Sequence, residues 1–567
     1  MNTEILGVIL MYIVVLALAV PLGKYISRVF ALEPMGADKI FNHLEKLLYR
    51  AAGIDQSKAM SWKGNLIALL TINLIWFLIS LFVLMNMRWL PLNPDGNPSM
   101  NVSLAFNTSV SFITNTNLQH YAGETGVSYL GQLMLLLWQF VSAATGIAIC
   151  AVAFVAIKEK TTTKTGNFYV FFVRTITRIL LPLAFIGGFI LIFNGTPMTF
   201  DGKIHTTTLE GADQVISTGP VAAFVSIKQL GTNGGGYYGS NSSNPMENPN
   251  YLSNILETVF ISLIPIAMIF AFGFFTGKKK LATIILGVMT IGFLILAITS
   301  ITSEMKGNPA IDSLGINQNM GNMEGKEVRF GSAASAYWAV NTTCTSNGSV
   351  NSMHDSMTPL TGIAALTAMM VNSFYGGAGV GFLNFYIFII LAVFISGLMV
   401  GRTPEFLGKK IESKEVKIAV SIALLHPFFI LTGTALASYL FAHNPDKYAV
   451  WLNNPSYHGF SEMLYEFTSA AANNGSGFEG LGDNTVFWNI STAIIMLLAR
   501  YLPIIGPVAI AGILATKSYT PESTGTLNTE TTTFGMVIFF VVIIIAALSF
   551  FPALALSQFA EYFTLYQ

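Results

Sequence analysis

Ten apolar stretches of membrane-crossing length constrain the fold of this chain more than any other feature. They occupy residues 4–22, 64–87, 129–157, 170–193, 252–276, 281–302, 372–400, 417–442, 486–516 and 532–556. A helix needs about 20 apolar residues to cross the hydrocarbon core of a bilayer. Only 10% of the residues are charged, whereas a soluble domain has about 25%. The sequence therefore predicts an all-α polytopic membrane protein with about ten transmembrane helices.

Lysine and arginine are unevenly distributed over the loops between these stretches. If alternate loops face the cytoplasm, beginning with residues 24–63, those loops hold 22 of the 29 basic residues. Such an excess is typical of the cytoplasmic side. We therefore expect the N-terminus outside and, with ten spans, the C-terminus outside as well. No basic residue precedes the first stretch and no small-residue cleavage site follows it, so it is interpreted as a retained helix.

Four short polar cassettes lie in the loops predicted to face outward. Each follows a moderately apolar stretch of about ten residues, too short to cross a bilayer. The cassettes are Thr114-Asn115-Thr116-Asn117, Thr232-Asn233-Gly234, Ser346-Asn347-Gly348 and Asn473-Asn474-Gly475, and the stretches are residues 102–112, 221–230, 333–340 and 463–472. This recurrence predicts four span–pore-loop–span repeats in a pseudo-four-fold array.

The repeats divide the chain into six parts. Residues 1–30 and 530–567 form additional helices, and the four repeats occupy residues 60–158, 168–277, 278–402 and 415–517. The seventh stretch contains four glycines between residues 376 and 381. Glycines at this density favour a discontinuous span. The polar outer segment over residues 303–337 is too long for a turn and is interpreted as a cap over the cassettes, a surface for a partner, or a flexible insertion.

The cassettes have the composition of a cation filter. A dehydrated cation needs a cage of oxygens, which backbone carbonyls supply without fixed charge. Aiming successive carbonyls at one axis requires positive φ, which glycine adopts freely and asparagine better than most residues. No carboxylate lies within a cassette, which argues against a Ca²⁺ site. Three cassettes contain Asn-Gly; in the first, either Thr116 or Asn117 occupies the glycine position.

Several charged residues and histidines lie near the predicted filter. Arg402 and Arg500 stand near the inner ends of spans seven and nine, where an arginine either blocks ion leakage or anchors the helix end. The outer carboxylates are interpreted as mostly solvated or interfacial, although Glu466 could raise the cation concentration at the mouth; they are Glu247, Glu257, Glu304 and Glu466. The scattered histidines His120, His354 and His458 predict no metal site.

Other classes of function find little support. The net charge is +0, which gives no electrostatic case for nucleic acid. Cys150 and Cys344 lie in different segments, so no disulfide is expected. Residues 163–167 read Thr-Lys-Thr-Gly-Asn, which lacks the aspartate that a P-type ATPase phosphorylates, and no phosphate-binding loop motif occurs. A membrane enzyme would also need an acid–base or metal cluster, which the sequence does not indicate.

Long strings around the cassettes carry a family resemblance. With the first cassette followed by Gln119, the chain has Leu230-Gly231-Thr232-Asn233-Gly234-Gly235-Gly236, then Cys344-Thr345-Ser346-Asn347-Gly348-Ser349 and Gly401-Arg402-Thr403-Pro404-Glu405. On these residues the chain resembles, over its whole length, the KdpA family of potassium-translocating subunits of bacterial Kdp P-type ATPases. It departs from the family pattern at Leu118, where tryptophan is expected, and at Tyr237-Tyr238, where phenylalanine is common.

The resemblance implies a fold like that of the superfamily of K⁺ transporters and a place in the bacterial inner membrane. It implies K⁺ as the transported ion, no covalent cofactor, no ATP hydrolysis by this chain alone, and the partners KdpB, KdpC and KdpF. It also implies a sideways tunnel to the ATPase, with Arg402 and Arg500 near it. The implied ion-binding residues are Thr114, Asn115, Thr116, Asn117, Gln119, Thr232, Asn233, Gly234, Cys344, Thr345, Ser346, Asn347, Gly348, Asn473, Asn474 and Gly475. The alternative is a stand-alone K⁺ channel-like transporter.

Overall fold

A computed structural model describes residues 3–36, 38–454, 456–521 and 528–566. Within these ranges, ten helical segments are long and apolar enough to cross a membrane. They are α1 (Thr3–Phe30), α3 (Trp62–Asn86), α6 (Tyr129–Lys158), the joined α7 (Phe168–Arg174) and α8 (Leu181–Phe193), α10 (Tyr251–Thr276), α11 (Lys279–Lys306), α15 (Val380–Val400), α16 (Ser413–His443), α18 (Val486–Thr516) and α19 (Thr532–Leu556). The predicted all-α polytopic class and the number of spans in the described residues are confirmed, although the seventh span begins later than predicted.

Four shorter helices stand where the pore helices were expected. They are α4 (Val102–Ile113), α9 (Val221–Leu230), α13 (Gly331–Cys344) and α17 (Ser456–Ala472). Each leads directly into one of the four cassettes, and most of its residues are buried. The third and fourth pore helices begin before the predicted residues 333 and 463. Both helices are buried in the protein, so their added first residues did not have to be strongly apolar to be helical.

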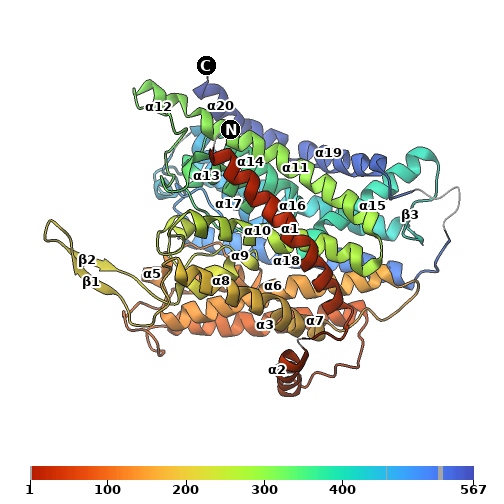
Figure 1. The fold of residues 1–567 in the computed structure, drawn as a ribbon. Coiled ribbons are helices and arrows are strands. Elements are labelled where there is room, and N and C mark those ends of the chain that lie inside the picture. Colours follow the sequence, from red (N-terminus) through yellow and green to blue (C-terminus); the bar gives the residue numbers. More distant parts are fainter. Residues whose placement is uncertain (1–2, 37, 455, 522–527, 567) are drawn as a thin grey trace.

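The remaining elements lie mainly at the two ends of the helix bundle (Figure 1). They are α2 (Asp38–Ala51), α5 (Gly123–Gly126), α12 (Pro309–Ser313), α14 (Pro359–Val371), α20 (Gln558–Leu565) and two antiparallel strand pairs, β1 (Ile204–Thr207) with β2 (Asp213–Ile216) and β3 (Glu405–Phe406) with β4 (Lys409–Lys410). A π-helical turn joins α7 to α8, and short 3₁₀ turns occur at residues 241–243, 354–356 and 449–451. In Figure 1 both chain ends and α12 lie at the upper left, the β1–β2 hairpin projects at the left, α2 lies below the bundle and β3 lies at the right.

Two helices form the centre of the bundle. In α6 and α10, 83% and 89% of the most apolar window is buried, against 22% in α1 and 28% in α3. The central helices are therefore enclosed by protein, whereas α1 and α3 leave much of their apolar surface at the periphery, as lipid-facing helices do.

The seventh span differs from the prediction at its start. The span expected at residues 372–400 begins at Val380, and residues 372–379 form a non-helical segment between α14 and α15. Five residues of that segment have positive φ: Asn372, Tyr375, Gly376, Gly377 and Gly379. A helix requires negative φ at each position, so the expected discontinuity is present and falls at the beginning of the predicted span.

The amphipathic helix α2 has no counterpart among the predictions. Arg178 of the π turn donates to Asp38 Oδ1 at 2.5 Å and to Glu45 Oε1 at 2.5 Å. The Arg178 side chain is fully buried, within the stretch 170–193 that was predicted to form the fourth span. These ion pairs hold α2 against the fourth span.

Candidate ion pathway

The four cassettes share one backbone conformation. In each, two residues with positive φ flank one with negative φ. The flanking pairs are Asn115 (φ 65°) and Asn117 (55°), Thr232 (50°) and Gly234 (81°), Ser346 (50°) and Gly348 (85°), and Asn473 (50°) and Gly475 (106°). Asn117 therefore occupies the glycine position of the first cassette, which the sequence left open between Thr116 and Asn117.

The cassettes pack against one another in cyclic order. A Cβ added at Gly234 would overlap the carbonyl oxygen of Asn347 in the third cassette. In the same way, Gly348 faces the Asn474 carbonyl oxygen and Gly475 faces the Thr116 carbonyl oxygen. The residue between the two positive-φ positions thus presents its carbonyl to the glycine of a neighbouring cassette.

Hydrogen bonds between the first two cassettes close this ring. Asn115 Nδ2 donates to the Thr232 carbonyl oxygen at 2.8 Å, and Asn233 Nδ2 donates to Asn115 Oδ1 at 2.7 Å. Four loops with equivalent backbones therefore surround a common axis, as the repeat pattern predicted. A ring of this kind gathers backbone oxygens without fixed charge, which suits a cation that has lost its water.

Asparagine amides brace the cassettes from behind. Asn347 Nδ2 lies 3.3 Å from the carbonyl oxygens of both Lys228 and Gln229. Asn474 Nδ2 donates to the Thr342 carbonyl oxygen at 2.9 Å, and Asn473 Nδ2 donates to Thr116 Oγ1 at 3.0 Å. Because these bonds cross from one repeat to another, the cassettes hold each other in place.

Three glycines of the second repeat present their carbonyls to side-chain amides. Gly234 O accepts from Asn241 at 2.7 Å, Gly235 O from Gln139 at 3.4 Å, and Gly236 O from Gln119 at 3.0 Å. Gln119 Oε1 also accepts from the Gly236 N–H at 2.7 Å. Gln119 therefore links the first two cassettes.

Three other predicted residues lie where the pore helices end. Thr114 Oγ1 donates to the Val110 carbonyl oxygen at 2.8 Å, and Thr345 Oγ1 donates to the Asn341 carbonyl oxygen at 2.7 Å. Cys344 is buried and its carbonyl oxygen accepts from the Gly376 N–H at 2.8 Å. The C-terminal ends of all four pore helices meet the ring, and a helix C-terminus favours a cation.

The non-helical segment 372–379 lies against the cassettes. Besides the Gly376 bond to Cys344, Ala378 N–H donates to Thr232 Oγ1 at 3.0 Å. Ser346 Oγ donates to Asn372 Oδ1 at 3.0 Å. The segment thus contacts both the second and the third cassette on the side where their pore helices end.

The two arginines selected from the sequence have different surroundings. Arg500 is 7% exposed, and among the described residues no carboxylate or hydrogen-bond acceptor contacts its guanidinium. A Cβ built on Gly146 would lie 3.3 Å from Arg500 Nη2 and 2.8 Å from the Ala378 carbonyl oxygen, so Arg500 lies beside segment 372–379. Arg402 is exposed beyond the end of α15.

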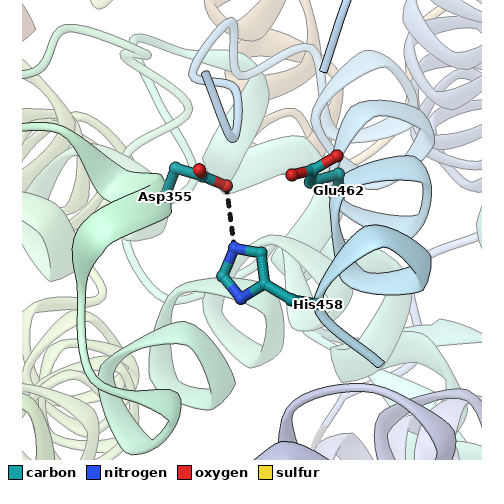
Figure 2. A group of neighbouring side chains, drawn as sticks. All are labelled: Asp355, His458 and Glu462. Carbon is teal, nitrogen blue, oxygen red and sulfur yellow. Dashed lines mark hydrogen bonds and ion pairs between the residues drawn. The ribbon is translucent and has the colours of Figure 1, made fainter. Parts of the chain in front are cut away.

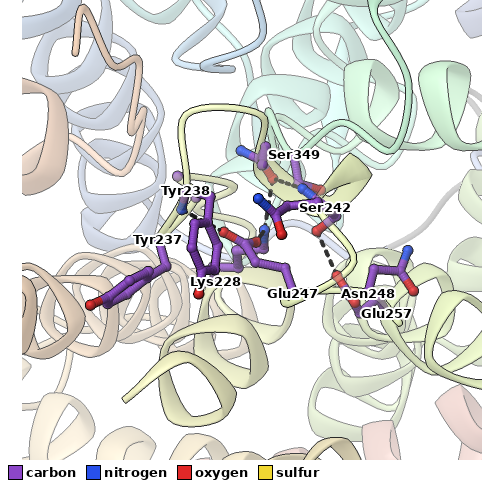
Figure 3. Close-up of polar contacts among 12 residues, drawn as sticks. Lys228, Tyr237, Tyr238, Ser242, Glu247, Asn248, Glu257 and Ser349 are labelled. Atoms are coloured by element: carbon purple, nitrogen blue, oxygen red, sulfur yellow. Dashed lines mark hydrogen bonds and ion pairs between the residues drawn. The ribbon is translucent and has the colours of Figure 1, made fainter. Parts of the chain in front are cut away.

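A buried charge network lies behind the second cassette (Figure 3). Lys228 of α9 forms an ion pair with Glu247, both side chains being fully buried, and donates to Asn241 Oδ1 at 2.7 Å. Asn241 in turn holds the Gly234 carbonyl. Sequence reasoning missed this network, although a lysine inside an apolar pore-helix stretch was an available signal.

The prediction that the outer carboxylates are mostly solvated or interfacial is wrong. Glu247, Glu257, Glu304 and Glu466 are each at most 2% exposed. Glu257 Oε2 accepts from Gln229 at 2.8 Å and Ser242 at 2.7 Å, and Glu304 pairs with Lys326 at 2.9 Å. A buried carboxylate is tolerated when hydrogen bonds or an opposite charge compensate its lost hydration.

Glu466 is paired within the protein and does not face the outer solution. Its Oε1 lies 3.1 Å from His120 Nε2, and His120 Nδ1 lies 2.7 Å from Asn489 Oδ1. Burial disfavours the charged imidazole, but the carboxylates of Asp483 and Glu466 outweigh burial and raise the pKa of His120 to about 9. The imidazolium therefore offsets the charge of Glu466 and joins the first cassette's loop to α17.

The outer segment over residues 303–337 packs against the chain that follows two cassettes. Lys326 forms a β-bridge with Ser352, and the Met353 N–H donates to the Gly325 carbonyl oxygen at 2.8 Å. Arg329 donates to the Asn248 and Ser243 carbonyl oxygens at 3.1 and 2.6 Å. In the structure this segment is therefore an integral part of the bundle, packed on the chain that follows the second and third cassettes.

The family profile and the sequence relatives match this chain over nearly its whole length. The KdpA family profile, described as "Potassium-transporting ATPase A subunit", matches residues 9–563. Relatives described as "Potassium-transporting ATPase potassium-binding subunit" are 60% identical in Flavobacterium johnsoniae and 56% identical in Phocaeicola vulgatus, each alignment covering 100% of both chains. The relative of that description from Geobacillus kaustophilus is 46% identical over 98% of each chain. The crystal structure of the potassium transporter TrkH from Vibrio parahaemolyticus matches at a TM-score of 0.49 and 15% identity, covering 89% of this chain and 98% of that one.

Proposed function

The chain belongs to the KdpA family, the A subunits of potassium-transporting ATPases, and from this premise we propose that it binds K⁺ and passes it to a separate P-type ATPase subunit. It is a non-hydrolytic subunit of an ATP-driven uptake pump. The observation that carries the proposal is the ring of four cassettes with one shared backbone conformation. Such a ring supplies oxygens to a dehydrated cation, while the separate ATPase subunit hydrolyses ATP.

The K⁺ site in this proposal comprises the cassette residues and their flanks. In this proposal the carbonyls of Thr116, Asn347 and Asn474, each facing a neighbouring cassette, form one layer of the cage together with the equivalent carbonyl of Asn233. The other proposed ion-binding residues are Thr114, Asn115, Asn117, Gln119, Thr232, Gly234, Cys344, Thr345, Ser346, Gly348, Asn473 and Gly475. The positive-φ geometry and the cross-repeat amide bonds support this assignment.

We further propose that K⁺ enters from outside and turns sideways below the ring. The contacts of segment 372–379 with the second and third cassettes support this route, because in the proposal the segment obstructs a straight path. The buried Arg500 beside this segment repels a cation, because two like charges in a protein interior of effective dielectric about 20 cost roughly 4 kcal/mol at 4 Å separation. Arg402, exposed at the end of α15, serves in this scheme as a positive-inside anchor.

The same proposal assigns location, partners and repeat boundaries. The chain lies in the bacterial inner membrane with both termini outside, supported by the 22 of 29 basic residues in alternate loops. Its partners are KdpB as the ATPase, with KdpC and KdpF as accessory subunits. The repeats occupy residues 60–158, 168–277, 278–402 and 415–517, with additional helices at 1–30 and 530–567.

The test is ATP hydrolysis by the complex that co-purifies with this chain, with K⁺ titrated against Na⁺. Stimulation by K⁺ at concentrations where Na⁺ has no effect supports the proposal. If no ATPase co-purifies and the reconstituted chain conducts K⁺ passively, the protein is instead a stand-alone channel-like transporter.

A further inference from the structure

Three potential metal ligands, Asp355, His458 and Glu462, lie close together as a cluster (Figure 2), and His458 also contacts the C-terminal helix α20. Asp355 lies in the turn after the third cassette, and His458 and Glu462 stand four residues apart on α17. One ligand atom from each of the three residues lies within 4.8 Å of the other two. Asp355 is 8% exposed and Glu462 is fully buried. The cluster therefore joins two repeats of the fold in a largely enclosed position.

The imidazole of His458 is oriented by a carboxylate outside the cluster. His458 Nδ1 lies 2.9 Å from Glu561 Oε1 of α20, and Nε2 lies 2.9 Å from Asp355 Oδ1. In protein metal sites, a carboxylate commonly holds one ring nitrogen of a histidine so that the other faces the metal. Glu561 stands in that supporting position, and Nε2 points into the cluster.

Glu462 has an oxygen with no partner in the described protein. Its Oε1 accepts from Asn454 Nδ2 at 3.1 Å, whereas its buried Oε2 has no hydrogen bond. Figure 2 shows this carboxylate turned toward Asp355. A buried carboxylate oxygen left unpaired is costly, so a cation at this point would remove a penalty that the protein alone leaves in place.

The backbone makes room for the two carboxylates to converge. A Cβ at Gly480 would overlap Glu462 Oε1 and lie 2.8 Å from Asp355 Oδ2, so a larger residue there would push both groups apart. A cavity of about 210 Å³ borders Asp355, His458 and Glu561. An ion can therefore reach the cluster through space that the fold already provides.

We propose that Asp355, His458 and Glu462 bind a divalent transition-metal ion of the Zn²⁺ or Mn²⁺ class. One imidazole nitrogen with carboxylate oxygens suits such ions better than Mg²⁺ or Ca²⁺, which prefer oxygen ligands alone. Zinc lies about 2.0–2.2 Å from such ligand atoms, so two ligands of one ion are at most roughly 4.4 Å apart. Small rotations of the two carboxylates close the difference from 4.8 Å.

The bound ion would act as a clamp on the outer end of the bundle. It connects the turn after the third cassette to the fourth pore helix and, through Glu561, to the C-terminal helix α20. This site is separate from the K⁺ ring, so its occupancy by a transition metal does not depend on which ion the ring selects.

The experiment treats the full-length chain with a chelator, removes the chelator by dialysis, and titrates in ZnCl₂ while calorimetry measures the heat of binding. Zinc K-edge absorption then reports the ligands. We expect one saturable site with one imidazole ligand. Both His458→Ala and Glu462→Gln should weaken binding at least tenfold, and His458→Ala should remove the imidazole signature. His205→Ala, at an exposed histidine of β1, is the matched control and should bind as the unmodified chain does.

Two results would overturn the proposal. One is that the unmodified chain binds no zinc at a defined stoichiometry, which would leave His458 as an imidazolium paired with Asp355 and Glu561 only. The other is that Glu462→Gln binds zinc as tightly as the unmodified chain. Glu462→Gln keeps the size of the side chain and so decides the question even if His458→Ala fails to fold, with size-exclusion profiles reporting the folded state.

Discussion

Replacing Gly234 with alanine tests the ring geometry at its tightest point. Gly234 has φ of +81°, and a Cβ there would lie 2.5 Å from the carbonyl carbon of Asn347 and overlap its oxygen. Left-handed backbone costs an alanine about 1–2 kcal/mol. Two carbon atoms normally approach to about 3.5 Å, so the third cassette must also move by roughly 1 Å.

That displacement acts on a carbonyl that we place in the K⁺ cage. Each 1.4 kcal/mol corresponds to about tenfold in affinity, so the backbone term alone accounts for roughly five- to thirtyfold. With the overlap added, we expect the K⁺ concentration for half-maximal ATPase stimulation to rise at least tenfold in Gly234→Ala. Gly348→Ala and Gly475→Ala should act in the same direction, because both glycines have positive φ and face a neighbouring cassette's carbonyl.

The assay is K⁺-stimulated ATP hydrolysis by the purified complex, with Gly188→Ala as the matched control. Gly188 is a buried helical glycine of α8 whose added Cβ would meet only the Ala222 carbonyl oxygen, at 3.8 Å. It should leave the K⁺ dependence unchanged. If Gly234→Ala assembles normally and responds to K⁺ at the same concentration as Gly188→Ala, the assignment of the ring as the K⁺ site is refuted.

Three further predictions concern residues around the ring. Asn117→Gly should keep the K⁺ dependence within about threefold because glycine fits its φ of 55°, whereas equal loss in Asn117→Gly and Asn117→Val would contradict the conformational argument. Arg500→Gln should raise passive Rb⁺ leakage into proteoliposomes at least tenfold, while the exposed Arg402→Gln should not; equal leakage in both would exclude a barrier at Arg500. Lys228→Met should destabilise the chain by about 3–5 kcal/mol in thermal unfolding, because it strands the buried Glu247. Adding Glu247→Gln should restore part of that loss, and an unchanged melting temperature in Lys228→Met would count against the ion pair.

Features that depend on a local pattern of residues could be predicted from the sequence. Ten apolar stretches predicted ten spans because a bilayer leaves a chain few other ways to satisfy its backbone. The recurrence of Asn and Gly predicted four equivalent loops, since only a few residue types accept positive φ. The glycines between residues 376 and 381 likewise indicated a break, although the break takes up the first eight residues of the predicted span, so that the helix begins at Val380.

Contacts between residues far apart in the sequence, in contrast, depend on how the repeats pack. The local sequence allowed either Thr116 or Asn117 to occupy the glycine position of the first cassette. The structure places Asn117 there, with a φ of 55°. Glu247 and Glu304 were predicted to be solvated or interfacial. In the structure both are buried, because each forms an ion pair with a buried lysine, Lys228 or Lys326. His458 meets Asp355 from more than 100 residues away. Such pairings arise from the packing of separate repeats. The residue pattern within one segment therefore cannot predict which charged side chains of another segment will contact it.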